Sequence, residues 1–158
     1  MLGTCLPALT RRALVIAVLM LAALLPSRSL NAQAAQAPAK RVFGSDAGMI
    51  FNNIKPDKTG DFEMVVAKLK EALAKSKKPE RQEQAASWKV FKSVEPGAGG
   101  SVLYIFLMDP VVKGADYTVS TILNEAFPAD VQQLYTAFAG AYAGGQSFVN
   151  LTLVSAMK

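Results

Sequence analysis

Residues 101–109 read SVLYIFLMD and hold seven consecutive apolar residues between a glycine-rich turn and an Asp-Pro dipeptide. That length, with valine, isoleucine and aromatic residues in it, predicts a strand that is buried on both faces. Side chains alternate across a strand, so one face is aliphatic and the other is mixed. The aliphatic set is Leu103, Ile105 and Leu107, and the mixed set is Tyr104, Phe106 and Met108. Such a strand needs two covers, and we expect helices of the same chain on one face and a second subunit on the other.

The chain is expected to begin with a secretory signal peptide, residues 1–34. Arg11 and Arg12 give it a positive start, and the uncharged run that follows, residues 13–25, has 13 residues. A helix that spans a bilayer needs roughly 20 residues, whereas a shorter run is typical of a signal peptide. Residues 32–34 read AQA, the form of a cleavage site. An uncleaved N-terminal membrane anchor is the alternative, and the arginine pair leaves both the general secretory and the twin-arginine route open.

Removal of this segment changes the charge of the protein. Arg11, Arg12 and Arg28 leave with it, so 17 basic residues become 14 against 12 acidic ones, and the net charge falls from +5 to +2. A charge that small gives no reason to expect a nucleic-acid partner. The only cysteine, Cys5, leaves as well. We therefore expect a periplasmic or secreted protein, free of the membrane after cleavage, that packing holds together without a disulfide.

Residues 46–158 are predicted to form a single α+β domain after a flexible leader at 35–45. Periodicity and turn signals place strands at 48–54, 88–95, 101–109 and 147–154, and helices at 61–78, 117–127 and 130–143. This order is the ferredoxin-like βαββαβ arrangement with a four-stranded antiparallel sheet. Right-handed crossovers put the helices on one face of that sheet and leave the other face bare.

The bare face decides the oligomeric state that we expect. We predict that the aliphatic sets of the last two strands contact the helices and that the mixed sets face away from them. These mixed sets are Tyr104, Phe106 and Met108, with Phe148, Asn150 and Thr152. An apolar patch of that size is expected to be covered, and two copies that face each other cover it with twofold symmetry, as a homodimer. The facing of the first two strands stays open, because each has large apolar side chains on both sides.

The order of elements and two stretches of sequence resemble the dimeric α+β barrel superfamily, which includes antibiotic-biosynthesis-monooxygenase-like and stress-responsive barrel proteins. The stretches are residues 54–69, IKPDKTGDFEMVVAKL, and residues 103–110, LYIFLMDP. The resemblance covers residues 48–154, and within the group the chain is most similar to small exported bacterial proteins of no assigned activity. It implies a dimer with a cavity between sheet and helices. It implies no activity, because one fold hosts many functions.

Histidine and cysteine, on which many catalytic sites depend, are absent from the expected mature protein. The chain contains no histidine, which excludes histidine general bases, Ser-His-Asp triads, imidazole zinc sites and a histidine haem ligand. Haem-degrading members of the resembled superfamily bind iron through histidine, so this chain departs from them at the decisive residue. No cysteine follows Cys5 for thiol chemistry or iron–sulfur ligation. We predict neither a metal site nor a cofactor.

Six residues are candidates for lining a cavity, and three functions stay open. The candidates are Asn52, Trp88, Tyr104, Phe106, Asn150 and Thr152. The first function is binding of a small apolar or aromatic molecule in the barrel, without catalysis. The second, borrowed from the resembled fold, is a cofactor-independent monooxygenase or isomerase, in which an asparagine donates a hydrogen bond to a substrate oxygen while Tyr104 or Trp88 stacks on its ring. The third is a structural or partner-binding dimer without a cavity. No residue is assigned a catalytic role.

Overall fold

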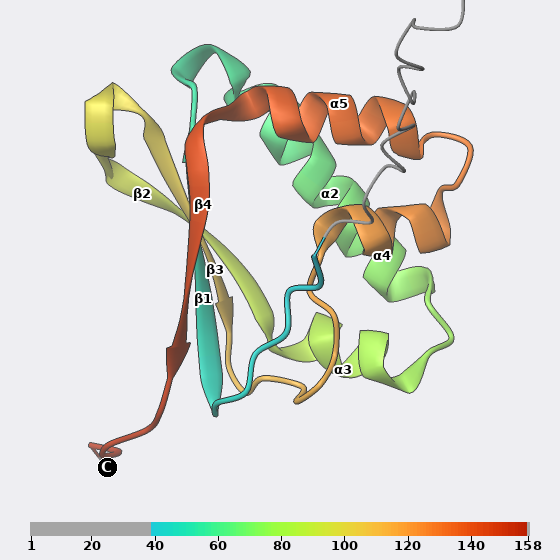
Figure 1. Cartoon of the computed structure of the whole chain (residues 1–158), viewed down its shortest axis with the longest axis vertical. Coiled ribbons are helices and arrows are strands. Elements are labelled where there is room, and N and C mark those ends of the chain that lie inside the picture. The colour runs from blue at the N-terminus through green and yellow to red at the C-terminus, as the bar shows by residue number, and fades with distance from the viewer. Residues whose placement is uncertain (1–38, 158) are drawn as a thin grey trace, which may run out of the picture. The chain divides into compact units, whose positions relative to one another are not determined.

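The computed structural model describes residues 39–157, which form a four-stranded antiparallel sheet with helices on one of its faces (Figure 1). The strands are β1 (Ala47–Ile54), β2 (Trp88–Pro96), β3 (Val102–Met108) and β4 (Tyr142–Leu151), and the helices are α2 (Thr59–Lys75), α3 (Pro79–Ser87), α4 (Val119–Ala126) and α5 (Val131–Ala141). The predicted α+β fold with a four-stranded antiparallel sheet is confirmed. The expected signal peptide lies outside the described residues. No helix within residues 39–157 has the length and apolar composition to cross a membrane.

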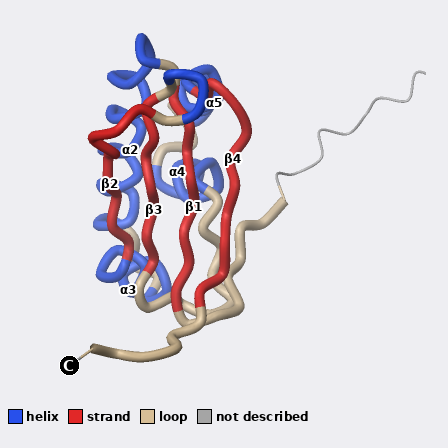
Figure 2. Tube along the Cα trace, turned by 90° about the vertical axis from the view of Figure 1, so that its left-hand side faces the viewer, coloured by secondary structure: helices blue, strands red, loops and turns tan. Residues whose placement is uncertain are grey.

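The strands lie side by side in the order β2-β3-β1-β4, and every neighbouring pair is antiparallel. Figure 2 shows them in this order with the helices behind the sheet. Ile50 in the central strand β1 is paired with Phe106 of β3 and with Phe148 of β4. Paired residues share a face, because side chains alternate in step along neighbouring strands. This row therefore fixes which side chains of three strands point the same way.

Helix α2 provides the main cover of the sheet. Its buried residues recur at three- and four-residue spacing, which gives one apolar stripe. They are Phe62, Val65, Leu69, Ala72 and Leu73. The helix ends at Lys75, earlier than predicted, because Ser76 takes an extended conformation. Pro79 then occupies the first turn of the separate helix α3, where its missing N–H leaves no hydrogen bond unmade.

The mixed face of β3 contacts the helices, so the prediction that it faces away from them is wrong. Tyr104, Phe106 and Met108 are at most 3% exposed. The ring of Phe62 lies 4.8 Å from that of Tyr104 and 6.0 Å from that of Phe106, centroid to centroid. The large rings thus fill space between the sheet and α2, as the close packing of protein interiors favours. The aliphatic set of β3 instead lies on the face that no described helix covers (Figure 2).

Strand β4 also differs from the prediction in its start and in its facing. It begins at Tyr142, directly after α5, and runs through Gly144 and Gly145, whereas the sequence predicted a strand only from residue 147. Phe148 and Asn150 lie on the helix side: the Phe148 ring packs edge-on 6.0 Å from Phe43, and the Asn150 side-chain oxygen accepts the Gly44 N–H at 3.0 Å. Thr152 follows the strand and is exposed. The mixed set of β4 is therefore not on the open face.

Residues 41–44, expected in the flexible leader, pack against the domain. Phe43 is 1% exposed, and its ring lies 5.4 Å from Tyr117 in an edge-on contact. Both backbone polar groups of Arg41 are hydrogen-bonded to the loop before α4. Its carbonyl accepts the Tyr117 N–H at 2.7 Å, and its N–H donates to the Thr118 hydroxyl at 3.0 Å. The domain therefore begins before residue 46.

A buried arginine joins α3 to α4 and to the loop before it. Arg81 is 2% exposed and donates two hydrogen bonds to the Glu125 carboxylate, at 3.2 and 3.0 Å. It also bonds to the side-chain oxygen of Gln84 at 2.7 Å and to the Asp116 carbonyl. The hydrogen bond from Arg81 holds the pKa of Glu125 below its ordinary value. A buried charge with this many partners fixes the position of the 110–118 loop, which borders the site described below.

Replacement of Gly48 tests the packing of Phe43. A Cβ atom at position 48 would lie 2.4 Å from the ring of Phe43, so Gly48→Ala must displace a buried ring. We expect the free energy of unfolding to fall by about 1–3 kcal/mol, measured by urea unfolding. Gly44→Ala is the control, since nothing lies within 4 Å of its added Cβ. Equal stability of the two variants would mean that Phe43 does not pack beneath β1.

Candidate functional site

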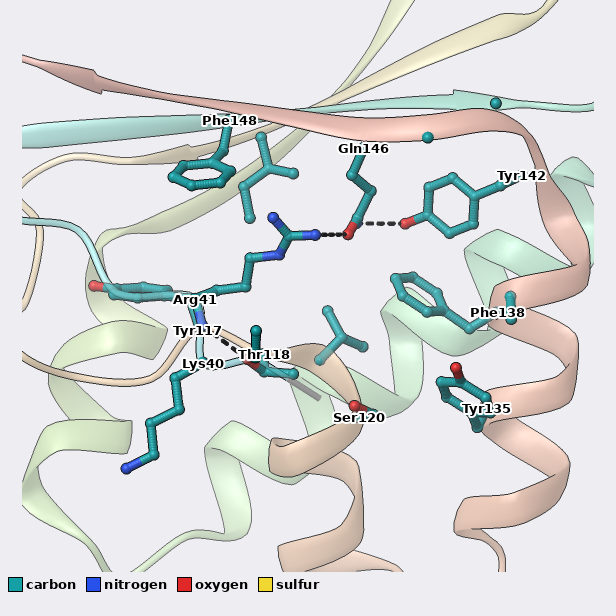
Figure 3. A pocket seen from close by; sticks show the side chains of 16 residues that line it. Lys40, Arg41, Tyr117, Thr118, Ser120, Tyr135, Phe138, Tyr142, Gln146 and Phe148 are labelled. Carbon is teal, nitrogen blue, oxygen red and sulfur yellow. Dashed lines mark hydrogen bonds between the residues drawn. The ribbon is translucent and has the colours of Figure 1, made fainter. Parts of the chain in front are cut away.

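A cleft of about 540 Å³ lies on the helix side of β4, a size that suits a small molecule. It is bounded by β4, by α5, by the start of α4 and by the segment that carries Arg41 (Figure 3). The larger polar and aromatic side chains that line it are Lys40, Arg41, Tyr117, Tyr135, Phe138, Tyr142, Gln146 and Phe148. Three segments far apart in the sequence thus meet at one opening.

Aromatic rings form much of the wall of the cleft. Phe138 stacks on the core residue Phe62 at 5.7 Å, and Tyr142 packs edge-on against Phe138 at 5.1 Å. Tyr135, which lies on α5 with Phe138, is 49% exposed and stands at the rim. Ring faces and edges presented together suit a flat aromatic ligand, since aromatic pairs prefer offset or edge-to-face contact.

A chain of hydrogen bonds runs from the core into the cleft, and it begins at Asn52. This residue is fully buried in β1. Its amide nitrogen donates to the backbone carbonyls of Ile50 and Tyr104, at 3.3 and 3.2 Å. Its carbonyl oxygen therefore points the other way, where it accepts the Tyr142 hydroxyl at 2.9 Å and the Gln146 amide at 2.7 Å. The backbone carbonyls leave the Asn52 side chain only one orientation.

The orientation of Asn52 fixes that of Gln146 and thereby the place of Arg41. Both amide hydrogens of Gln146 are used, one on Asn52 and one on the Tyr142 hydroxyl at 2.7 Å. The Gln146 oxygen is left as an acceptor, and a guanidinium nitrogen of Arg41 donates to it at 2.9 Å (Figure 3). The guanidinium also lies 5.2 Å from the centre of the Phe148 ring, within cation–π range. Arg41 is thus a cation held in place from two sides.

The cleft has a positive character. Lys40 and Arg41 line it, and no aspartate or glutamate is among its lining residues. Within residues 39–157, no carboxylate forms an ion pair with Arg41. Burial raises the pKa of the Tyr142 phenol above its ordinary value of 10.0, so this hydroxyl is neutral at physiological pH. The charged residues of the lining are therefore Lys40 and Arg41, and the Asp116 carboxylate, which is outside the lining, accepts the backbone N–H of Arg41 at 3.1 Å.

The six residues predicted to line a cavity do not come together in the structure. Asn52 lies behind the cleft, and its amide nitrogen donates to two backbone carbonyls. Tyr104 and Phe106 are core residues. Asn150 binds the backbone of Gly44, and Thr152 follows the end of β4.

Trp88 does not line the cleft of Arg41, although its ring contacts Tyr117, which does. Its ring packs edge-on against Phe106 at 5.5 Å and against Tyr117 at 5.3 Å. It borders a different hollow, between β2 and α2. Its indole nitrogen is buried with no hydrogen-bond partner among the residues described. Trp88 therefore acts mainly as a packing residue of the sheet–helix layer.

Sequence reasoning missed Arg41 and Gln146, two of the polar residues that line the cleft. Arg41 was placed in a leader, although an aromatic residue two positions later, Phe43, is a signal for a segment that docks on a core. Gln146 follows two glycines and lies between the predicted helix at 130–143 and the predicted strand at 147–154. No local pattern marks it, because its role depends on its pairing with Asn52 across the sheet.

Comparison of the sequence with models of known protein families gives no match, and comparison with curated proteins gives none either. Across residues 39–157, no group of three or more histidine, cysteine, aspartate or glutamate side chains is arranged to hold a metal ion. The cleft itself offers a positioned guanidinium, a series of neutral hydrogen-bonded side chains and a wall of aromatic rings.

The pH dependence of stability tests the burial of Tyr142. Because its pKa is raised on folding, the stability that its neutral phenol contributes is fully present below pH 10 and is lost as the pH rises above that value. We expect the urea midpoint of the unmodified protein to fall more steeply above pH 10 than that of Tyr142→Phe. At pH 8 the variant should be less stable by about 1–3 kcal/mol, because it loses two hydrogen bonds, the one donated to Asn52 and the one accepted from Gln146. Parallel pH profiles would contradict the buried phenol.

Proposed function

We propose that this chain is the subunit of an exported homodimer that binds a small aromatic molecule in the cleft between β4 and helices α4 and α5. The observation that carries the proposal is the cleft itself, which combines a wall of rings with a few fixed polar groups. Ligand sites typically have this composition, with apolar walls that provide affinity and a small number of polar groups that orient the ligand. The position between sheet and helices is also the one that the resemblance to dimeric α+β barrel proteins implies.

Binding without catalysis is favoured over a monooxygenase or isomerase by the state of the polar groups. The chain has no histidine, and the pKa of Tyr142 is raised by burial, away from the range that suits a general base near neutral pH. The Asn52 amide, which an oxygenase of the resembled fold would use toward substrate, is committed to the backbone. These groups are suited to orienting a ligand and poorly suited to general acid–base catalysis.

The open face of the sheet supports the homodimer. Its side chains are partly or fully exposed, and no described helix covers them (Figure 2). The apolar ones are Met49, Phe51, Phe91, Leu103, Ile105, Leu107, Val149 and Leu151. A patch of this extent on one sheet is expected to be covered, and a second copy covers it with twofold symmetry. The strand order β2-β3-β1-β4 supports the ferredoxin-like arrangement that we propose for each subunit. In the proposed dimer, the open faces of two such sheets would meet.

Export is proposed on the residues before the domain. Residues 1–34 combine a positive start, an uncharged run of 13 residues and small residues at the expected cleavage site. A domain without cysteine after residue 5 folds alike in reducing and oxidising compartments, so export places no disulfide demand on it. Either secretory route delivers the same mature domain.

A lysine on the open face tests the dimer. Ile105 lies in β3 among the apolar residues of that face, and Ile105→Lys would bury an unpaired charge between the two sheets. We expect sedimentation equilibrium to show a dimer for the mature protein and a folded monomer for the variant. Gln132→Lys, which adds the same charge to an exposed position of α5, should remain dimeric. A monomeric mature protein, or a dimeric Ile105→Lys, would exclude a sheet-to-sheet dimer.

A bulky residue in the cleft tests the binding site. Ala139 lines the cleft from α5 and is itself exposed, so Ala139→Trp fills the space without removing a core contact. We expect it to weaken binding of 2-naphthamide, a neutral flat probe, by at least about tenfold, measured by calorimetry. Gln133→Trp, on the same helix and outside the cleft, should bind as the unmodified protein does. Equal binding by both variants would place the ligand elsewhere.

A further inference from the structure

We propose that the cleft is selective for aromatic carboxylates and that Arg41 is the residue that binds the carboxylate group. This inference rests on the proposed function, because it names the chemical class of the ligand in the same cleft. The geometry that points to it is a guanidinium at the polar end of an aromatic pocket. A ligand with a ring and a carboxylate would place the ring among Phe138, Tyr142 and Phe148 and the charge at Arg41.

The guanidinium of Arg41 retains donors for a ligand. Arginine has five N–H donors in a planar fork. Within the described part of the chain, the only hydrogen bond that this guanidinium makes is the one to the Gln146 oxygen, at 2.9 Å. The unused N–H groups match the two oxygens of a carboxylate, which arginine binds in bidentate fashion. A neutral amide offers one acceptor oxygen and no charge, so it satisfies fewer of these donors.

The position of the guanidinium is set before any ligand binds. Gln146 cannot turn its oxygen away from Arg41, because its amide hydrogens are held by Asn52 and Tyr142. The backbone of Arg41 is fixed by hydrogen bonds to the 116–118 loop. A donor that is already oriented loses little conformational freedom on binding, which favours affinity. The interaction is thus preorganised for a ligand acceptor at one point in the cleft.

The charges around the cleft favour an anion over a neutral or cationic ligand. Lys40 adds a second positive charge to the lining, and no lining residue is acidic. Arg41 is partly buried, with the Phe148 ring on one side. In such surroundings an ion pair is screened less than in bulk water, so a carboxylate gains more there than at an exposed lysine. A cationic ligand would meet two like charges.

Binding of a matched pair of probes tests the inference. The probes are 2-naphthoate and 2-naphthamide, which share the ring system and differ in charge. With the mature protein at pH 7, we expect calorimetry to give tighter binding of the naphthoate, by about tenfold or more. Arg41→Gln should weaken naphthoate binding by about 10- to 100-fold and change naphthamide binding by less than about threefold. Arg41→Lys should bind naphthoate more weakly than the unmodified protein and more tightly than Arg41→Gln, because it keeps the charge and loses the planar fork.

The outcomes separate the inference from the proposed function. Equal binding of the two probes by the unmodified protein would overturn the carboxylate preference and leave the aromatic site standing. Binding of neither would overturn both. A carboxylate preference that survives in Arg41→Gln would overturn the role of Arg41. Lys113→Gln is the control for loss of one positive charge, since this exposed lysine lies outside the cleft. Should Arg41→Gln fail to fold, Arg41→Lys and the comparison of probes on the unmodified protein decide.

Discussion

The packing of one ring at the start of α2 sets the relation between the two layers of this domain. Phe62 is fully buried, and its centroid lies within 6.1 Å of the rings of Tyr104, Phe106, Phe138 and Tyr142. These contacts join α2 to β3, α5 and β4. Each aromatic pair contributes about 0.5–1.5 kcal/mol beyond the area that it buries. The cluster determines which face of the sheet the helices cover, and it holds two of its rings where they form the wall of the cleft.

The polar counterpart of that cluster is the amide of Asn52. A buried amide is unfavourable unless its hydrogen bonds are made, and here two donated and two accepted bonds account for it. The accepted bonds come from β4, so the amide also favours one alignment of β1 and β4. Through Gln146 the same group sets the position of a cation at the surface. A buried amide thus influences the geometry of the site although it contacts no ligand itself.

The sequence predicted the elements better than their facing. The apolar stripe of α2 and the alternation in β3 indicated a helix and a strand correctly, because both patterns are local. Which face of β3 meets the helices depends on the size of the space beneath α2, and both faces are apolar, so no local pattern decides it. The start of β4 was missed because Gly144 and Gly145 resemble a helix end, whereas pairing with β1 extends the strand through them. The cleft depends on contacts between distant segments, and the sequence alone did not reveal it.

Strand β4 lies at an edge of the sheet, and its alternate residues belong to the two surfaces on which the proposals rest. Gln146 and Phe148 line the cleft, whereas Ser147 and Val149 lie on the open face. One backbone therefore carries both, and a ligand that moves it by a fraction of an ångström alters the surface that meets a second subunit. Thermodynamic linkage makes such an effect mutual. Occupancy of the cleft and the protein concentration at which subunits separate would then be two readings of a single equilibrium.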